Sequence, residues 1–347
     1  MLEKHKCSVY PIPLVNSSTL YKKAKKKFIS SENKYLYNVC YMNSSIQCLF
    51  HLSKFSNILF CSGNKLTNAT IKLLSSMMNK KNKILSVSEI KEAMAEIDDK
   101  YNDNNPEDAN EFISNYLNAL HDEIANKNGD FQTKILYSKD DEESFQKFYK
   151  KFYESKGSSF IIDSFYGILR SVSFCKKCDV TFSVRFHSFN ILELPLYNIE
   201  NHDNKILNMH NILKKFITKK IIKHAKCSKC GKDTYIKTSL YYLPDCLIIF
   251  FERNSEKGYI KNDIEILETI DFNYYLYNYD SIKQSNNVYD LKGIIYYDIY
   301  KNDFGHYSAS FKFDDKWYCL NDESKEDQDE PHNYVNDNAI LLFYEKK

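Results

Sequence analysis

Four of the ten cysteines in this chain form two CxxC pairs, Cys175-Lys-Lys-Cys178 and Cys227-Ser-Lys-Cys230. Each pair can supply two thiolate ligands from one tight turn, and Zn²⁺ prefers four such ligands in a tetrahedron. The first pair lies between the segments GILRSVSF and VTFSVRF, as expected at the tip of a β-hairpin. The spacing therefore predicts a structural zinc site that joins two distant turns. A closed four-cysteine site has no open coordination position, so we expect no catalytic cofactor.

Composition places the chain in a reducing compartment without an evident nucleic-acid or membrane partner. The 347 residues include 48 basic and 46 acidic side chains, a net charge of +2, which gives no reason to expect binding to nucleic acid or to an anionic membrane. The start of the chain lacks an apolar signal segment, and LYYLPDCLIIFF is too short to span a bilayer. We therefore expect a cytoplasmic or nuclear protein with reduced thiols. A zinc ribbon that binds nucleic acid stays as an alternative, disfavoured by the charge balance.

Hydrophobic periodicity predicts an α+β fold. From Tyr35 to about Ile124 the spacing is helical, and a helix with Asn105 as its N-cap is expected to begin in NPEDANEF. From about Phe160 the period changes to two, as in VTFSVRF and HYSASFKF, which is typical of antiparallel strands. Residues 1–30 end in the basic run YKKAKKKF and are interpreted as a basic tail or extension.

Cys40, in YNVCYMNSSIQCLF, is a candidate nucleophile because it precedes an amphipathic helical stretch. At a helix N-terminus the macrodipole favours the thiolate. Cys48 falls near the apolar stripe of the same stretch and is more simply a packed thiol. A lone cysteine is more often packed than reactive, so this reading needs a base and a residue that orients the base.

His306 is the best-placed base among the nine histidines, at the start of a strand after Gly305. A two-residue hairpin loop at Asp314-Asp315 would place Asn321 diagonally opposite His306 on the same face, within side-chain reach. In this register Asp322 points to the other face, whereas a register shifted by one residue would exchange these two candidates. We expect the oxygen of Asn321 to accept the Nδ1–H of His306, so that Nε2 faces the thiol.

Four blocks of the sequence, in order along the chain, resemble those of the ubiquitin-specific proteases, which are papain-like cysteine peptidases. The blocks are YNVCYMNSSIQCL, PEDANEFISNYLNALHDEI, the two CxxC segments with LPDCLIIFFER, and GHYSASFKFDDKWYCLND with NAILLFYEK. The resemblance implies a catalytic domain over 31–347 with a helical thumb (about 31–130), zinc-bearing β fingers (about 165–245) and an antiparallel β palm formed by the remainder. It also implies hydrolysis of the bond after the C-terminal glycine of ubiquitin through a Cys thioester. The partners implied are ubiquitin and ubiquitinated proteins, with regulatory subunits as a further class.

The resemblance assigns roles to particular residues of this chain. Cys40 is the implied nucleophile, His306 the base and Asn321 its orienter. The residues implied to hold the ubiquitin tail are Asp108, Glu111 and Tyr307.

The sequence departs from the family pattern just before the nucleophile. Tyr35 stands where the family has an asparagine that helps hold the oxyanion, and Tyr37 replaces a usual glycine. Tyr35, Asn38 and the backbone N–H of Cys40 are the donors that remain. The departure at Tyr35 keeps open the alternative of a catalytically weakened scaffold that binds ubiquitin. A protease for a ubiquitin-like modifier is a further alternative.

Overall fold

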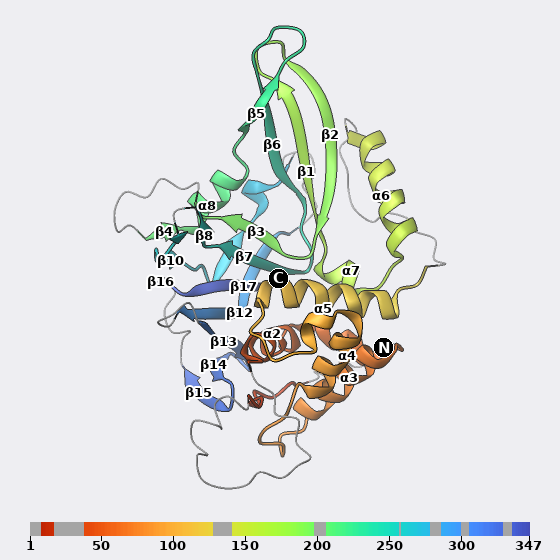
Figure 1. Ribbon diagram of the computed structural model, residues 1–347, viewed down its shortest axis with the longest axis vertical. Helices are drawn as coiled ribbons and strands as arrows, with labels where there is room; N and C mark the ends of the chain where they lie inside the picture. The colour runs from red at the N-terminus through yellow and green to blue at the C-terminus, as the bar shows by residue number, and fades with distance from the viewer. Residues whose placement is uncertain are drawn as a thin grey trace. The chain divides into compact units, whose positions relative to one another are not determined.

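The computed structural model describes residues 8–16, 38–127, 141–197, 206–256, 258–277, 286–299, 305–328 and 335–347 (Figure 1). It divides into two compact units, described separately below. The first comprises residues 1–124 and 292–343, and the second residues 125–291 and 344–347. Mixed helices and antiparallel strands confirm the α+β prediction. The expected division into thumb, fingers and palm stays a prediction.

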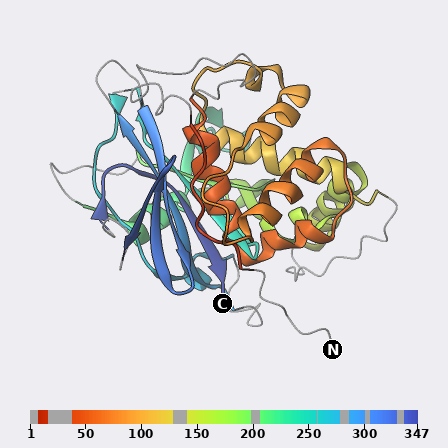
Figure 2. The ribbon, with the colours of Figure 1, turned by 90° about the horizontal axis from the view of Figure 1, so that it is seen from below.

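The helices of the first unit include one, α2, that is buried along its whole length. Their bounds are α2 Cys40–Phe50, η1 Ser53–Phe60, α3 Lys65–Met77, α4 Ser88–Ile97, η2 Asp99–Tyr101 and α5 Ala109–Ile124. Every residue of α2 is buried, because the helix packs on α5 and η1 as well as on strands β13 (Gly305–Phe313) and β14 (Lys316–Asn321). Figure 2 shows α2 and its neighbours against the face of these blue strands. The N-terminus of α2 is thereby fixed beside the sheet.

The sheet of the first unit has the order β15-β14-β13-β12-β17, with β12 Val288–Ile299, β15 Ser324–Gln328 and β17 Ala339–Lys346. A short strand, β16, covers Val335–Asn336. Phe313 pairs with Lys316, so Asp314 and Asp315 form the two-residue loop that was predicted. Their φ angles are 51° and 60°, as in the type I′ turns that match the twist of a hairpin. The predicted register between these two strands is therefore confirmed.

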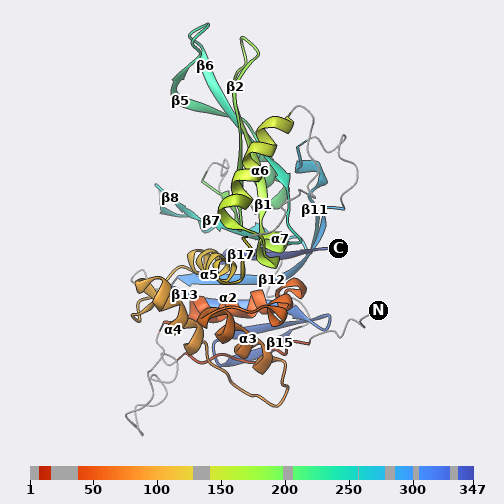
Figure 3. The same cartoon turned by 90° about the vertical axis from the view of Figure 1, so that its right-hand side faces the viewer.

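The second unit contains a four-stranded antiparallel sheet in the order β2-β1-β6-β5. Its strands are β1 Gly167–Cys175, β2 Val180–Phe189, β5 Lys220–Lys226 and β6 Asp233–Tyr242. Helix α6 (Glu142–Lys156) packs on β2 through an aromatic cluster that includes Phe145, Tyr149, Phe186 and Tyr241 (Figure 3). This sheet brings the tips of two hairpins together.

The remaining elements of the second unit are short. They are α7 Phe160–Phe165, α8 Met209–Phe216, η4 Asn273–Tyr275, β3 Leu192–Pro195, β4 Leu207–Asn208, β7 Cys246–Glu252, β8 Asn254–Ser255, β9 Gly258–Tyr259, β10 Ile264–Glu265 and β11 Thr269–Asp271. β3 pairs with β7 and β4 with β10 in parallel, whereas β11 is antiparallel to β12. Across the described part of the chain, no helix is long and apolar enough to cross a membrane.

The expected start of one helix is wrong. The helix expected to begin after Asn105 begins at Ala109, because the carbonyl of Asp108 accepts its first hydrogen bond, from Phe112 N. Within the segment interpreted as a basic tail or extension, residues 8–16 are packed: Ile12, Leu14 and Asn16 are 4%, 0% and 1% exposed. The rest of the expected tail lies outside the described residues.

Candidate active site and metal centre

Cys40 is the first residue of α2 and is 7% exposed. The first backbone N–H groups of a helix have no partner within it, so the thiol lies at the positive end of the helix dipole. Asn38 has a φ of 53°, a left-handed conformation that asparagine tolerates, and its Nδ2 donates to Asn104 O at 2.8 Å. The turn at Asn38 leads directly into α2, whose first residue is Cys40.

His306 lies between Cys40 and Asn321. Its Nε2 is 2.7 Å from Asn321 Oδ1, and its ring is within hydrogen-bonding reach of the Cys40 thiol. The pairing of Ala309 with Leu320 places Asn321 diagonally across from His306, as predicted. The expected ring nitrogen is wrong, however: Nε2 faces Asn321, which leaves Nδ1 for the thiol. The physical reason is reach, since a diagonal pair is far apart and the distal nitrogen spans it.

Asp322 also approaches the His306 ring, contrary to the prediction. Its Oδ2 is 3.8 Å from His306 Nε2, and its side chain is 1% exposed. Strand β14 ends at Asn321, and Asp322 adopts a φ of 50°, so strand alternation no longer decides where its side chain points. Asn43 Nδ2 donates to Asp322 Oδ1 at 2.9 Å, and Asn16 Nδ2 donates to Oδ2 at 3.0 Å. Sequence reasoning missed both asparagines; the polar run after Asn321 is the signal that could have indicated the turn.

The pKa of His306 is raised to about 9. Burial of the ring acts in the opposite direction, but the hydrogen bond and charge of Cys40, the hydrogen bond to Asn321 and the charge of Asp322 together favour the imidazolium. Neighbours that stabilise the charged His306 ring are what a thiolate–imidazolium pair requires.

The three residues expected to hold a ubiquitin tail gather near the start of α5. The buried Tyr307 hydroxyl is within hydrogen-bonding reach of Ala109 N–H and close to the carboxylate of Asp108. Asp108 Oδ1 accepts from Asn110 N at 3.0 Å, and partial desolvation raises the pKa of Asp108. Glu111 forms an ion pair with Lys100 at 2.5 Å. The surface is acidic, but one carboxylate is already engaged by a cation of the chain itself.

Of the two expected oxyanion side chains, Tyr35 lies outside the described residues. Asn38 is exposed, and its amide is bonded to Asn104. Among the described residues, the backbone N–H groups at the start of α2 are the donors that remain beside Cys40.

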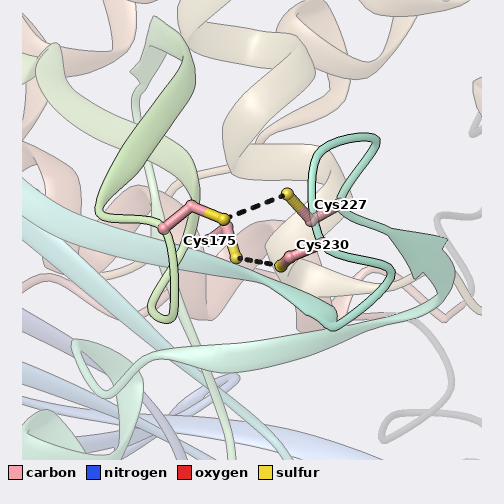
Figure 4. A group of neighbouring side chains, drawn as sticks. Cys175, Cys227 and Cys230 are labelled. Atoms are coloured by element: carbon pink, nitrogen blue, oxygen red, sulfur yellow. Dashed lines mark hydrogen bonds between the residues drawn. The ribbon is translucent and has the colours of Figure 1, made fainter.

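The four cysteines of the two CxxC pairs meet at the hairpin tips of the second unit. The Sγ atoms of Cys175 and Cys230 are 3.6 Å apart, and those of Cys227 and Cys178 are 4.0 Å apart. All four Sγ atoms lie within 4.8 Å of one another. Figure 4 shows the sulfurs of Cys175, Cys227 and Cys230 directed at one another. Zn–S bonds of about 2.3 Å in a tetrahedron place sulfurs roughly 3.8 Å apart, so this group could hold a metal ion.

Local backbone geometry forms the second knuckle. Gly231 N donates to Cys227 O at 2.8 Å, and Gly231 has a φ of 66°, which favours glycine. Desolvation would raise the pKa of Cys227, but the N–H groups of Lys229 and Cys230, together with the thiols of Cys230 and Cys175, outweigh it and lower that pKa. Such N–H groups stabilise the thiolate form that binds a metal.

Comparison with known proteins identifies the family to which the chain belongs. The family profile described as ubiquitin carboxyl-terminal hydrolase matches residues 33–344. The chain therefore belongs to the ubiquitin carboxyl-terminal hydrolase family, which confirms the resemblance inferred from sequence.

Two relatives show how far the similarity extends. The chain is 28% identical over 332 residues to ubiquitin carboxyl-terminal hydrolase Usp2 of Drosophila melanogaster, covering 89% of this chain and 34% of that protein. It is 24% identical over 342 residues to ubiquitin carboxyl-terminal hydrolase 2 of Bos taurus, covering 89% of this chain and 54% of that protein. The chain thus spans about a third to a half of the length of these relatives.

Solved structures show the same fold. A structure of the SAGA DUB module Ubp8/Sgf11/Sus1/Sgf73 bound to monoubiquitin matches with a TM-score of 0.65 and 19% identity, over 95% of this chain and 74% of that chain. A structure of the module bound to ubiquitin aldehyde matches with a TM-score of 0.66 and 18% identity. At these identities the likeness establishes the fold alone.

Proposed function

We propose that this chain is a thiol-dependent deubiquitinase that cleaves the isopeptide or peptide bond after the C-terminal glycine of ubiquitin. The observation that supports this most is the alignment of Cys40, His306 and Asn321 at the N-terminus of α2. A nucleophile, a base and a residue that orients the base are the minimum set for acyl transfer by a thiol. Membership of the hydrolase family points to the same reaction.

The proposed reaction has two stages. His306 Nδ1 takes the proton of the Cys40 thiol, and the thiolate attacks the glycine carbonyl carbon. Collapse of the tetrahedral intermediate breaks the C–N bond, and the imidazolium gives its proton to the leaving lysine amine. Water, deprotonated by His306, then hydrolyses the thioester and returns the thiol. The Cys40 N–H donates to the oxyanion in both stages.

The acidic surface near α5 would receive the basic tail of ubiquitin. We assign Asp108 and Glu111 to contacts with arginine side chains, and Tyr307 to the wall of the narrow channel for the terminal glycines. The support is that Tyr307 lines the same small cavity as Cys40, while Asp108 lies close to the Tyr307 hydroxyl. Ubiquitinated proteins are the proposed partners. A location in the cytoplasm or nucleus stays a prediction, as do regulatory subunits.

For the metal, we propose a structural Zn²⁺ held by Cys175, Cys178, Cys227 and Cys230. Four cysteine sulfurs within 4.8 Å of one another suit zinc better than harder cations. The ion would stabilise the hairpin tips of the second unit.

Ubiquitin carrying a C-terminal electrophile tests the enzyme proposal. We expect the wild type to form a covalent adduct at Cys40, Cys40→Ala to form none, and Asn321→Ala to react more slowly. Measurable ubiquitin binding without an adduct would contradict catalysis and favour the catalytically weakened scaffold. The hydrogen bond from the Asn38 amide to Asn104 supports that alternative, because it occupies a candidate oxyanion donor. Adducts only with a ubiquitin-like modifier would change the substrate, and salt-dependent binding of DNA without ubiquitin affinity would favour the zinc-ribbon alternative.

A further inference from the structure

Residues 8–16 lie outside the region that matches the family profile, yet they are built into the first unit. Tyr10 N donates to Met77 O at 3.0 Å, and Val15 N donates to Leu85 O at 2.9 Å. Val9, Ile12 and Leu14 bury their side chains. The segment is therefore fixed along its whole described length.

The same segment contacts the helix that carries Cys40. Gln47 Nε2 donates to Ile12 O at 2.7 Å, and Asn43 Nδ2 approaches Val15 O at 3.3 Å. Leu14 lines the small cavity that also includes Cys40. Segment 8–16 is thus part of the wall beside the nucleophile.

At the end of the segment, Asn16 donates hydrogen bonds to the turn that follows β14. Its backbone N–H donates to Glu323 Oε1 at 2.7 Å, and its Nδ2 donates to Asp322 Oδ2 at 3.0 Å. Asn16 and Asp322 are 1% and 5% exposed. Water does not easily replace a donor at such a buried carboxylate, so the direction of the carboxylate depends on its protein partners.

The two oxygens of Asp322 are held by different asparagines. Asn43 of α2 holds Oδ1, whereas Asn16 holds Oδ2, the atom that lies 3.8 Å from His306 Nε2. Asn16 therefore aims the oxygen that faces the base.

We propose that Asn16 is a positioning residue for catalysis, and that segment 8–16 acts on His306 through Asp322. This inference rests on the proposed function. Without the Asn16 amide, Oδ2 loses a hydrogen-bond donor and Asp322 turns away, so the imidazolium of His306 loses a negative neighbour. Because Asn16 is buried, the change affects the chemical step and leaves the binding of ubiquitin as it was.

The test uses the full chain and ubiquitin carrying a C-terminal fluorogenic amide. We expect Asn16→Ala to lower kcat by ~10-fold to 100-fold, the scale of a small misplacement of catalytic groups, with KM unchanged. Asn16→Ser, whose hydroxyl is too short to reach Oδ2, should behave alike and serves if the alanine variant does not fold. Asn16→Gln, which keeps the amide donor, should recover part of the rate.

Leu66→Ala is the control for a loss of stability, because it removes a buried apolar side chain of α3, outside segment 8–16. It should lower Tm and leave kcat within about 2-fold at temperatures well below Tm. A second readout is the titration of His306 by NMR, in which Asn16→Ala should lower the pKa. Unchanged kcat together with an unchanged His306 pKa in both Asn16→Ala and Asn16→Ser would overturn the proposal.

The titration separates this proposal from the proposed function. A wild type that neither turns over substrate nor forms an adduct would refute the deubiquitinase assignment. In that case the effect of Asn16→Ala on the His306 pKa still decides whether segment 8–16 acts on the base.

Discussion

Asp322 Oδ2 lies 3.8 Å from His306 Nε2, although Asp322 follows a strand whose alternation would point it away. A single residue with positive φ at the end of β14 produces this approach. The His306 ring is therefore flanked by a neutral amide, Asn321, at hydrogen-bond distance and by a buried carboxylate slightly farther off. The amide orients the ring, whereas the carboxylate favours its charged form.

The rate should fall on the alkaline side as His306 loses its proton. The pKa of His306 is raised to about 9, so the imidazolium is present below that pH and is lost as pH rises through it. We expect the alkaline limb of kcat/KM near pH 9. Asp322→Asn removes one of the charges that raise this pKa and should move the limb to lower pH. Asp327→Asn, the same change at an exposed site, is the control, and an equal shift in both variants would contradict the role of Asp322.

Removal of Lys100 should strengthen the recognition of ubiquitin. Lys100 pairs with Glu111, so the arginine of an incoming tail must displace it. We expect Lys100→Ala to lower KM by about 2-fold to 5-fold, the scale of an exposed ion pair, with kcat unchanged. Lys72→Ala breaks the similar pair with Glu89 and should leave KM unchanged. A higher KM in Lys100→Ala would instead show that Lys100 supports the site.

Zinc content should depend on the CxxC cysteines alone. Cys178→Ser removes one of four ligands, so we expect the loss of about one zinc per chain and a lower Tm. Cys61→Ser, at a partly exposed thiol in the first unit, should retain the metal. Metal content measured by plasma emission spectroscopy decides the matter, and full zinc in Cys178→Ser would argue against a four-cysteine site.

The β13–β14 turn should tolerate glycine better than aspartate. Asp315 has a φ of 60°, which costs a residue with a Cβ about 1 kcal/mol. We expect Asp315→Gly to raise Tm by roughly 1–3 °C, since each kcal/mol shifts Tm only slightly in a chain of this size. Asp315→Ala should lower Tm, because alanine lacks the side-chain oxygen that helps aspartate adopt this conformation. Calorimetry of the two variants measures both effects, and a lower Tm for Asp315→Gly would contradict the type I′ turn.

Short-range patterns in the sequence determined much of this protein. The two CxxC spacings predicted the cysteine cluster, the change of period predicted helices followed by strands, and Asp314-Asp315 with the flanking alternation predicted the register that places Asn321 across from His306. These features could be predicted because turn chemistry and side-chain alternation act over a few residues. They also carried the family resemblance.

The tertiary structure alone decided three further points: which nitrogen of His306 faces Asn321, the approach of Asp322 to the base, and the burial of residues 8–16. Asn16 meets Asp322 across 306 residues of sequence, and no local pattern encodes such a contact. Its apolar neighbours Val9, Ile12 and Leu14 were the available signal, but their spacing around two prolines fits neither helix nor strand. Long-range hydrogen bonds between buried polar groups depend on the packing of whole elements, which composition and periodicity do not specify.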